Sequence, residues 1–148
     1  MQPDHAIDDG RGLEDKLGTE RARPTYAFRS ILDAGGLLTF GSDWPVAPLS
    51  PLAGVHAAVT RQTIDGANPD GWLPAEKLTV EEALTAYTRM NAYAVFEDDV
   101  AGTLELGKRA DLVILSADPR AVEPAVIPKI DVLETVVGGA TAYLAVQP

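Results

Sequence analysis

A short apolar run that ends in a glycine and a single carboxylate constrains the fold of this chain most. The run covers residues 37–40 (Leu, Leu, Thr and Phe), and Asp43 follows three positions later. Because the run is too short for a helix and apolar on both faces, it favours a strand buried on both sides of a parallel sheet. Helix-like patterns precede it and resume at Ser50, so the segment predicts an α/β barrel or a doubly wound sheet.

Asp43 lies where chemistry is found in both of these folds. Catalytic and binding groups gather at the carboxyl ends of the strands in α/β barrels and doubly wound sheets. Aspartate is also common in loops, because its side chain stabilises turns. Position alone therefore leaves two interpretations open, a functional carboxylate and a residue that caps the loop or the following helix.

The chain changes character near residue 100. Before it, apolar residues recur at helical spacing, and a capping box from Thr79 to Glu82 opens a helix that runs to Ala94. After it, three segments are rich in strand-forming side chains, at residues 110–115, 132–137 and 141–145. Gly138 and Gly139 predict a hairpin turn between the last two. We therefore place a boundary here, with one domain at residues 1–99 and a small β region at residues 100–148.

The N-terminal part of the chain carries few chemical candidates. Residues 1–23 have a turn-like, charged pattern that predicts a solvated surface, with His5 as the one candidate for chemistry. A histidine near a terminus is also common as an exposed loop residue. Pro24 predicts the first turn of a helix that ends at Gly35-Gly36.

Six blocks of the sequence resemble, in the same order, blocks of the metal-dependent amidohydrolase superfamily. They are residues 1–5, 18–21, 41–46, 58–61, 82–88 and 102–115. The branch they resemble is amidohydrolase family 3, which includes N-substituted formamide deformylases. The resemblance covers nearly the whole chain but only the C-terminal end of a family member. It implies an α/β fold: the C-terminal portion of a TIM-like (β/α)8 barrel, with strands seven and eight and the helices after them, plus part of a flanking β-sandwich.

The same resemblance implies roles for two residues, and a third candidate comes from the residue type alone. It makes Asp43 the catalytic residue, as metal ligand and proton shuttle, and places His5 at the rim of the active site. Trp44, which could line an apolar pocket with Trp72, is a second candidate for substrate binding, although tryptophan more often packs in a core or interface. The cofactor implied is a divalent metal, zinc, in the complete enzyme.

This chain alone is expected to bind no metal tightly. A catalytic zinc site takes about three protein ligands, whereas the sequence has no cysteine and only two histidines, His5 and His56. A complete eight-stranded barrel also needs about 200 residues or more, and this chain has 148. We therefore interpret it as part of a larger barrel, inactive alone, whose exposed edges are covered by the remainder of the barrel or by self-association.

Two functions follow from different classes. The first is a hydrolase of non-peptide C–N bonds in a small-molecule amide or formamide substrate, with a metal-activated water as the nucleophile. The second is a non-catalytic remnant that serves as a binding or self-assembly module. In the family that the chain resembles, a His-x-His after the first barrel strand supplies metal ligands. Its presence in sequence upstream of Met1 would therefore favour the first function.

Composition limits the partners and the setting. A net charge of −10 argues against nucleic acid, since binding to phosphates depends on clustered Lys and Arg. The sequence has no apolar stretch long enough to span a membrane and no signal peptide pattern, so we expect no membrane partner. A cytoplasmic setting is the default expectation.

Overall fold

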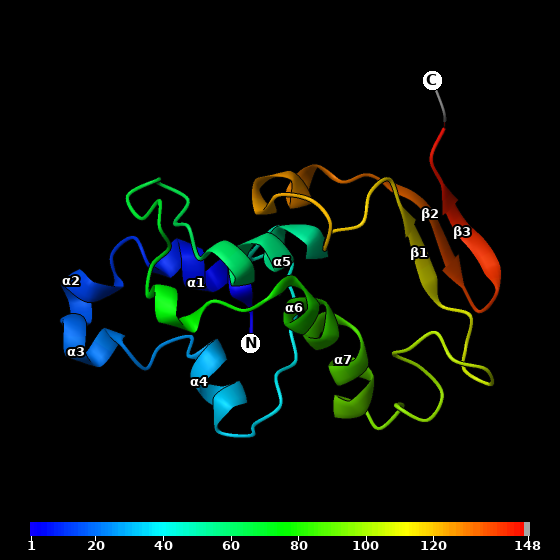
Figure 1. Cartoon of the computed structure of the whole chain (residues 1–148), viewed down its shortest axis with the longest axis horizontal. Coiled ribbons are helices and arrows are strands. Elements are labelled where there is room, and N and C mark those ends of the chain that lie inside the picture. Colours follow the sequence, from blue (N-terminus) through cyan, green and yellow to red (C-terminus); the bar gives the residue numbers. More distant parts are fainter. Residues whose placement is uncertain (147–148) are drawn as a thin grey trace.

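Helices fill the first two-thirds of the molecule, and a three-stranded antiparallel sheet follows them (Figure 1). A computed structural model describes residues 1–146. The helices are α1 Pro3–Asp9, α2 Leu13–Leu17, α3 Thr19–Ala22, α4 Phe28–Asp33, α5 Pro51–Thr60, η1 Pro74–Glu76, α6 Val80–Tyr87, α7 Arg89–Ala94 and η2 Pro124–Lys129. The strands are β1 Leu112–Leu115, β2 Val132–Val137 and β3 Ala140–Leu144. The chain is thus α/β, as predicted.

Two predicted helix starts are confirmed. Helix α5 begins at Pro51, directly after Ser50. Proline lacks an N–H, but amides in the first turn of a helix have no partner within the helix, so no hydrogen bond is lost. Helix α6 begins with the predicted capping box, in which the Thr79 side chain accepts from the Glu82 amide and Glu82 reaches back to the Thr79 amide. The sequence therefore determines these two ends locally.

Helix α4 begins later than predicted but ends as predicted. It starts at Phe28, whereas Pro24 lies in the turn that precedes it. At the other end Gly35 adopts a left-handed φ of 79°, and the Gly36 amide donates to the Ile31 carbonyl over 2.9 Å. This is the hydrogen-bond pattern that satisfies the last carbonyls of a helix.

The single helix predicted from Val80 to Ala94 is wrong, because the structure divides it at Thr88. This residue has φ −121° and ψ −87°, outside the helical region. Its hydroxyl donates to the Leu84 carbonyl over 2.8 Å, a bond that competes with the helical pattern. The Asn91 side chain also donates to the Tyr87 carbonyl, over 3.1 Å. Together these side chains stabilise a bend between α6 and α7.

The buried strand predicted at residues 37–40 is also wrong. The segment belongs to no sheet, and within residues 1–146 no strand lies beside it. Burial alternates instead: Leu38 and Phe40 are buried, but Leu37 is 59% exposed. The run is therefore covered on one side only, and the barrel that it suggested stays a prediction.

Single hydrogen bonds to distant segments replace the strand pairing of residues 37–40. The Phe40 amide donates to the Ala86 carbonyl over 3.1 Å. The Met1 amino group donates to the Thr39 carbonyl over 2.6 Å, and the Met1 carbonyl accepts from the Gly41 amide over 3.3 Å. These bonds hold the chain just before Asp43 against α1 and α6.

The solvated surface predicted for residues 1–23 is wrong in part, since this stretch forms the three short helices α1, α2 and α3. Pro3, Asp4 and Ala6 are buried in α1. The pattern misled because Asp8, Asp9 and Gly10 read as a turn, and they in fact end α1. Asp4, next to His5 in the sequence, is thus a buried residue that the charged pattern does not predict.

The C-terminal strands are confirmed. Strand β2 pairs antiparallel with both β1 and β3, and Gly138 and Gly139 turn the last hairpin with φ values of 58° and 81°. Val113, Thr135 and Tyr143 stand side by side on one face, and Ile114, Glu134 and Leu144 on the other. Both faces carry exposed apolar side chains, because the sheet packs against little else.

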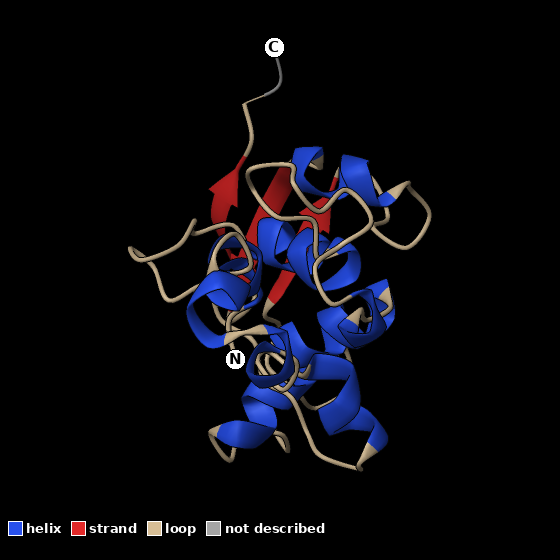
Figure 2. Cartoon of the chain, turned by 90° about the vertical axis from the view of Figure 1, so that its left-hand side faces the viewer, coloured by secondary structure: helices blue, strands red, loops and turns tan. Residues whose placement is uncertain are grey.

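The hydrophobic core lies among the helices. Phe28, Phe40 and Val55 are buried at its centre, and Ile127 of η2 joins them from the C-terminal part of the chain. Figure 1 shows η2 (orange) beside α5 and apart from the strands, and in Figure 2, turned by 90°, the three strands lie behind the helices. The predicted boundary near residue 100 stays a prediction; the last two residues of the predicted β region lie outside the described residues.

Across residues 1–146, no helix combines the length and the apolar character needed to cross a membrane.

Candidate functional site

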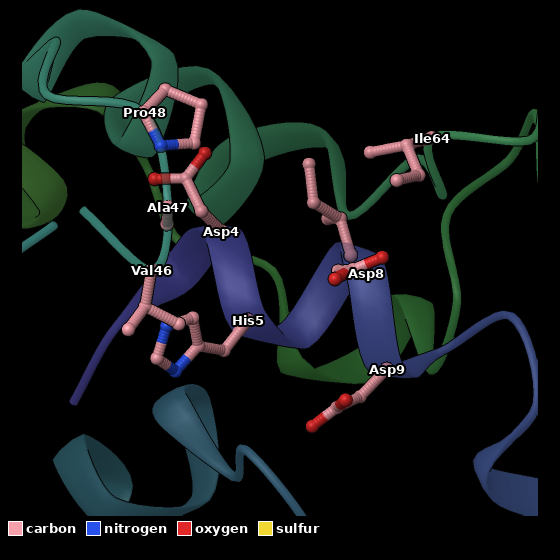
Figure 3. A pocket seen from close by; sticks show the side chains of 9 residues that line it. Asp4, His5, Asp8, Asp9, Val46, Ala47, Pro48 and Ile64 are labelled. Atoms are coloured by element: carbon pink, nitrogen blue, oxygen red, sulfur yellow. The ribbon is translucent and has the colours of Figure 1, made fainter. Parts of the chain in front are cut away.

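A cavity of about 300 Å³ opens between α1 and the loop that follows Asp43 (Figure 3). Its lining residues are Asp4, His5, Ile7, Asp8, Asp9, Val46, Ala47, Pro48 and Ile64. The volume is at the lower end of the range for small-molecule pockets. Of the three predicted site residues, His5 lines this cavity and Asp43 lies beside His5.

Helix α1 supplies most of the polar groups of the cavity. Pro3 starts the helix, and residues four apart share one face of a helix. Asp4 and Asp8 are therefore neighbours on one side of α1, and His5 and Asp9 are neighbours on an adjacent side. The helix packs against α5, which fixes the direction of these side chains relative to the opposite wall.

The structure brings His5 and Asp43 together. His5 Nε2 lies 3.8 Å from Asp43 Oδ2, and the two side chains are 25% and 54% exposed. Asp43 has a left-handed φ of 56°, a conformation that aspartate tolerates better than most residues, and its carbonyl accepts from the Val46 amide over 2.8 Å. A tight turn thus brings the carboxylate close to the imidazole, but beyond hydrogen-bonding distance, and the buried His5 Nε2 has no hydrogen-bond partner among the described residues. Their roles in catalysis and binding stay predictions.

The two tryptophans occupy different places. Trp44 is 64% exposed and is not among the described residues that line the cavity. Trp72 is buried, and its indole N–H donates to Glu14 over 3.2 Å. They do not form a shared pocket wall, since Trp72 borders a separate cavity with Gly10 and Glu14, and substrate contact by Trp44 stays a prediction.

Asp4 is a site residue that the sequence analysis missed. It is only 7% exposed, and its buried Oδ2 atom has no hydrogen-bond partner among the described residues. Burial raises the pKa of this carboxyl, although its own amide and His5 partly oppose the shift. Pro3 with an acid in the next position is a helix-start signal, and it would have placed Asp4 on the same helix as His5.

A second polar atom without a partner lies close to Asp4. The Tyr87 hydroxyl is buried and unpaired within residues 1–146, and burial raises its pKa, with the charge of Asp4 adding to the effect. A Cβ atom built on Gly54 would lie 1.8 Å from the Tyr87 oxygen and 3.2 Å from Asp4 Oδ2. Both groups thus border the backbone of α5, where only glycine leaves them room.

The other two carboxylates of the cavity have partners. The Arg11 side chain forms a salt bridge with Asp8, and the Tyr26 hydroxyl donates to Asp9. Burial and this carboxylate together raise the pKa of Tyr26 to about 12. Asp4 is therefore the cavity carboxylate whose buried oxygen lacks a partner.

The described residues do not fill a metal site by themselves. His5 and Asp43 offer one nitrogen and one carboxylate, which are ligand types that zinc accepts. Nowhere in residues 1–146 do three or more His, Cys, Asp or Glu side chains converge as a metal site requires. Because a catalytic zinc site takes about three protein ligands, further ligands would have to come from outside this part of the chain.

Comparison with known proteins gives a consistent result. The chain is 42% identical over 144 residues to the protein LONG AFTER FAR-RED 3 of Arabidopsis thaliana, covering 97% of this chain and 24% of that protein. It is 36% identical over 118 residues to an N-substituted formamide deformylase of Arthrobacter pascens, covering 80% of this chain and 21% of that protein. The chain thus spans about a quarter of the length of these relatives.

A solved structure shares the fold. The crystal structure of an uncharacterized metal-dependent hydrolase from Pyrococcus horikoshii superposes with a TM-score of 0.73 at 30% sequence identity, covering 84% of this chain and 25% of that one. The sequence profile of the amidohydrolase family matches residues 1–143. On these grounds the chain belongs to the amidohydrolase family.

Proposed function

We propose that this chain is the C-terminal part of a metal-dependent hydrolase that cleaves non-peptide C–N bonds in small amide or formamide substrates. Membership of the amidohydrolase family supports the reaction class. The relative named as an N-substituted formamide deformylase supports the bond type, and the structural neighbour named as a metal-dependent hydrolase supports the metal.

The observation that carries the proposal is the pairing of His5 with Asp43 beside the cavity. A carboxylate and an imidazole lie 3.8 Å apart, and they come from segments that are far apart in the sequence. This distance is longer than a hydrogen bond, so a proton would pass between the two groups through a water molecule or a substrate group that lies between them. Packing of α1 and the turn at Asp43 position both groups before any ligand arrives.

In the complete enzyme, we assign three roles. Asp43 would be one ligand of a divalent metal, zinc, and its carboxylate would take the proton of the attacking water and pass it to the leaving nitrogen. His5 binds the substrate at the rim, and the exposed Trp44 offers an apolar contact beside it. When bound, a divalent ion lowers the pKa of water to about 7, so that hydroxide is available at neutral pH.

Replacing Asp43 by Asn in the complete enzyme tests this proposal. The variant keeps the size of the side chain but cannot take a proton, so we expect turnover of N-formyl and N-acyl amines to fall about a hundredfold or more. Asp70→Asn, in the exposed loop before Trp72, is the matched control and should retain activity. Near-wild-type turnover of Asp43→Asn would exclude the assigned role.

The same assays on this chain alone form the second arm. His5 and Asp43 offer only two ligands for a metal, fewer than a catalytic zinc site takes. The chain alone should therefore bind no stoichiometric zinc and hydrolyse no N-formyl amine. Stoichiometric zinc with turnover from the isolated chain would show a site that the described residues do not reveal.

The open sheet supports the alternative of a self-assembly module. Val113 and Tyr143 on one face are 54% and 51% exposed, and Leu144 on the other is 65% exposed. Apolar side chains on both faces of one small sheet mark a surface that another protein segment covers. In the hydrolase that segment is the rest of the β-sandwich; in the alternative it is a second copy of this chain.

A further inference from the structure

The cavity beside α1 has a pronounced division between polar and apolar walls. Asp4 and His5 lie on the side of α1, and apolar side chains face them from the loop after Asp43 and from Ile64. Figure 3 shows the Asp4 carboxylate pointing from α1 toward Ala47 and Pro48. A ligand in this space would therefore meet a carboxylate at one end and hydrocarbon along its length.

The charge of the cavity has one sign. Three carboxylates line it, and among residues 1–146 no lysine or arginine does. Asp8 and Asp9 are paired with Arg11 and Tyr26, whereas Asp4 has a buried oxygen without a partner. That oxygen lies against the backbone of α5, beside Gly54, so a ligand in the cavity would approach the other oxygen of the same carboxylate. Because the Asp4 side chain is only 7% exposed, its charge is costly without further donors, and a ligand that brings an N–H donor gains more here than at an exposed aspartate.

We infer that this cavity binds a small apolar ammonium ion, with the Asp4 carboxylate accepting hydrogen bonds from its nitrogen. Val46 and Ile64 on the opposite side, together with Ile7 of α1 itself, cover the hydrocarbon part of the ligand. Asp4 is then a specificity residue, since it favours a nitrogen that carries protons and positive charge over a neutral or anionic group.

This inference deepens the proposed function and rests on it for its biological meaning. Hydrolysis of an N-substituted formamide or amide releases an amine, which is an ammonium ion at neutral pH. The cavity would hold the amine half of the substrate, with its apolar substituent along the loop. Binding of an amine needs neither a metal nor turnover, and so it can be measured independently of the reaction.

A titration of the full 148-residue chain with benzylammonium chloride, followed by NMR of the backbone amides, tests the inference. We expect saturable shifts at Ile7, Val46 and Ala47. Benzyl alcohol, which has the same ring without the charge, should bind about tenfold more weakly or worse. This comparison uses the wild-type chain and so does not depend on how a variant folds.

Two variants complete the test. Asp4→Asn should weaken benzylammonium binding about tenfold or more, whereas Asp99→Asn, in the exposed turn after α7, should leave it unchanged. Equal binding of benzyl alcohol and benzylammonium, undiminished binding to Asp4→Asn, or no saturable binding would each overturn the inference. None of these results bears on Asp43, whose role is tested by turnover, so the two proposals can fail separately.

Discussion

At the scale of single residues, Arg61 shows how this small protein uses a buried charge. Its side chain is fully buried and donates to the carbonyls of Trp72 and Tyr26 over 2.7 and 3.0 Å. The guanidinium also stacks on the rings of Phe28 and Trp72, with centroids at 5.1 and 5.5 Å. Burial lowers its pKa to about 10, partly opposed by the charge of Glu76. Arg61 thus joins the loop around Trp72 to the helical core.

Arg61→Ala should destabilise the protein by about 3 kcal/mol, because it leaves the buried Trp72 carbonyl without its side-chain donor, removes one of two hydrogen bonds to the Tyr26 carbonyl, and opens a cavity between two aromatic rings. Urea unfolding followed by tryptophan fluorescence would measure the loss. Arg23→Ala is the control, since Arg23 forms an exposed pair with Glu20 at 3.3 Å, and it should cost within about 0.5 kcal/mol. Equal losses in the two variants would contradict the structural role given to Arg61.

At the scale of elements, the start of α6 combines two kinds of stabilisation in one side chain. Glu82 accepts from the Thr79 amide over 2.8 Å and from Arg29 of α4, also over 2.8 Å. The bond from Arg29 is the main reason that the pKa of Glu82 falls to about 2. Glu82 therefore both caps its own helix and ties it to α4.

The stability that Glu82 adds should depend on pH. Its carboxyl has a pKa of about 2 in the folded chain and 4.5 as its ordinary value, so its contribution is present above pH 4.5 and is lost as the pH falls toward 2. Glu82→Gln should cost about 1 kcal/mol at pH 7 and little near pH 2. Thermal unfolding at both pH values, with the exposed Glu81→Gln as control, measures this. A loss that is the same at both pH values would show that the charge of Glu82 is unimportant.

Elements with local causes could be predicted from the sequence, and elements with distant causes could not. The capping box at Thr79 and the glycine turn after Val137 lie within a few residues of the structure they specify. The strand expected at residues 37–40 needs neighbouring strands, and apolar character alone could not show that the described chain lacks them. Asp43 and His5 were identified through family resemblance, whereas Asp4 was missed because its burial depends on α5 and on the loop after Asp43.

At the scale of the whole molecule, the helices bury a common core while the sheet stays open on both faces. Leu106 and Phe96 are also exposed, but they lie singly in turns, where apolar side chains are normal. In the sheet the exposed apolar residues share a face instead: Ile114 and Leu144 lie on the two sides of Glu134. The sheet is therefore the surface on which we expect contacts with other protein segments.

The isolated chain should self-associate through this sheet. Sedimentation velocity at increasing concentration should reveal species larger than the 15.7 kDa monomer. Leu144→Lys should reduce them, because a charge interrupts an apolar face and protects a sheet edge. Leu106→Lys adds the same charge outside the sheet and should have no effect. A wild-type chain that stays monomeric at every concentration would refute this expectation.

The neighbour relations of the strands have a consequence for the order of folding. Strands β2 and β3 are joined by two glycines, and β1 precedes β2 by 16 residues, so the sheet closes only short loops. The helical core must instead join Met1 to Thr39, Phe40 to Ala86 and η2 to α5. Since distant contacts form more slowly than local ones, amides of the β2–β3 hairpin should gain protection in pulsed hydrogen exchange before those of Phe40 and Leu78. The opposite order would mean that the hairpin forms only once the helical core is in place to support it.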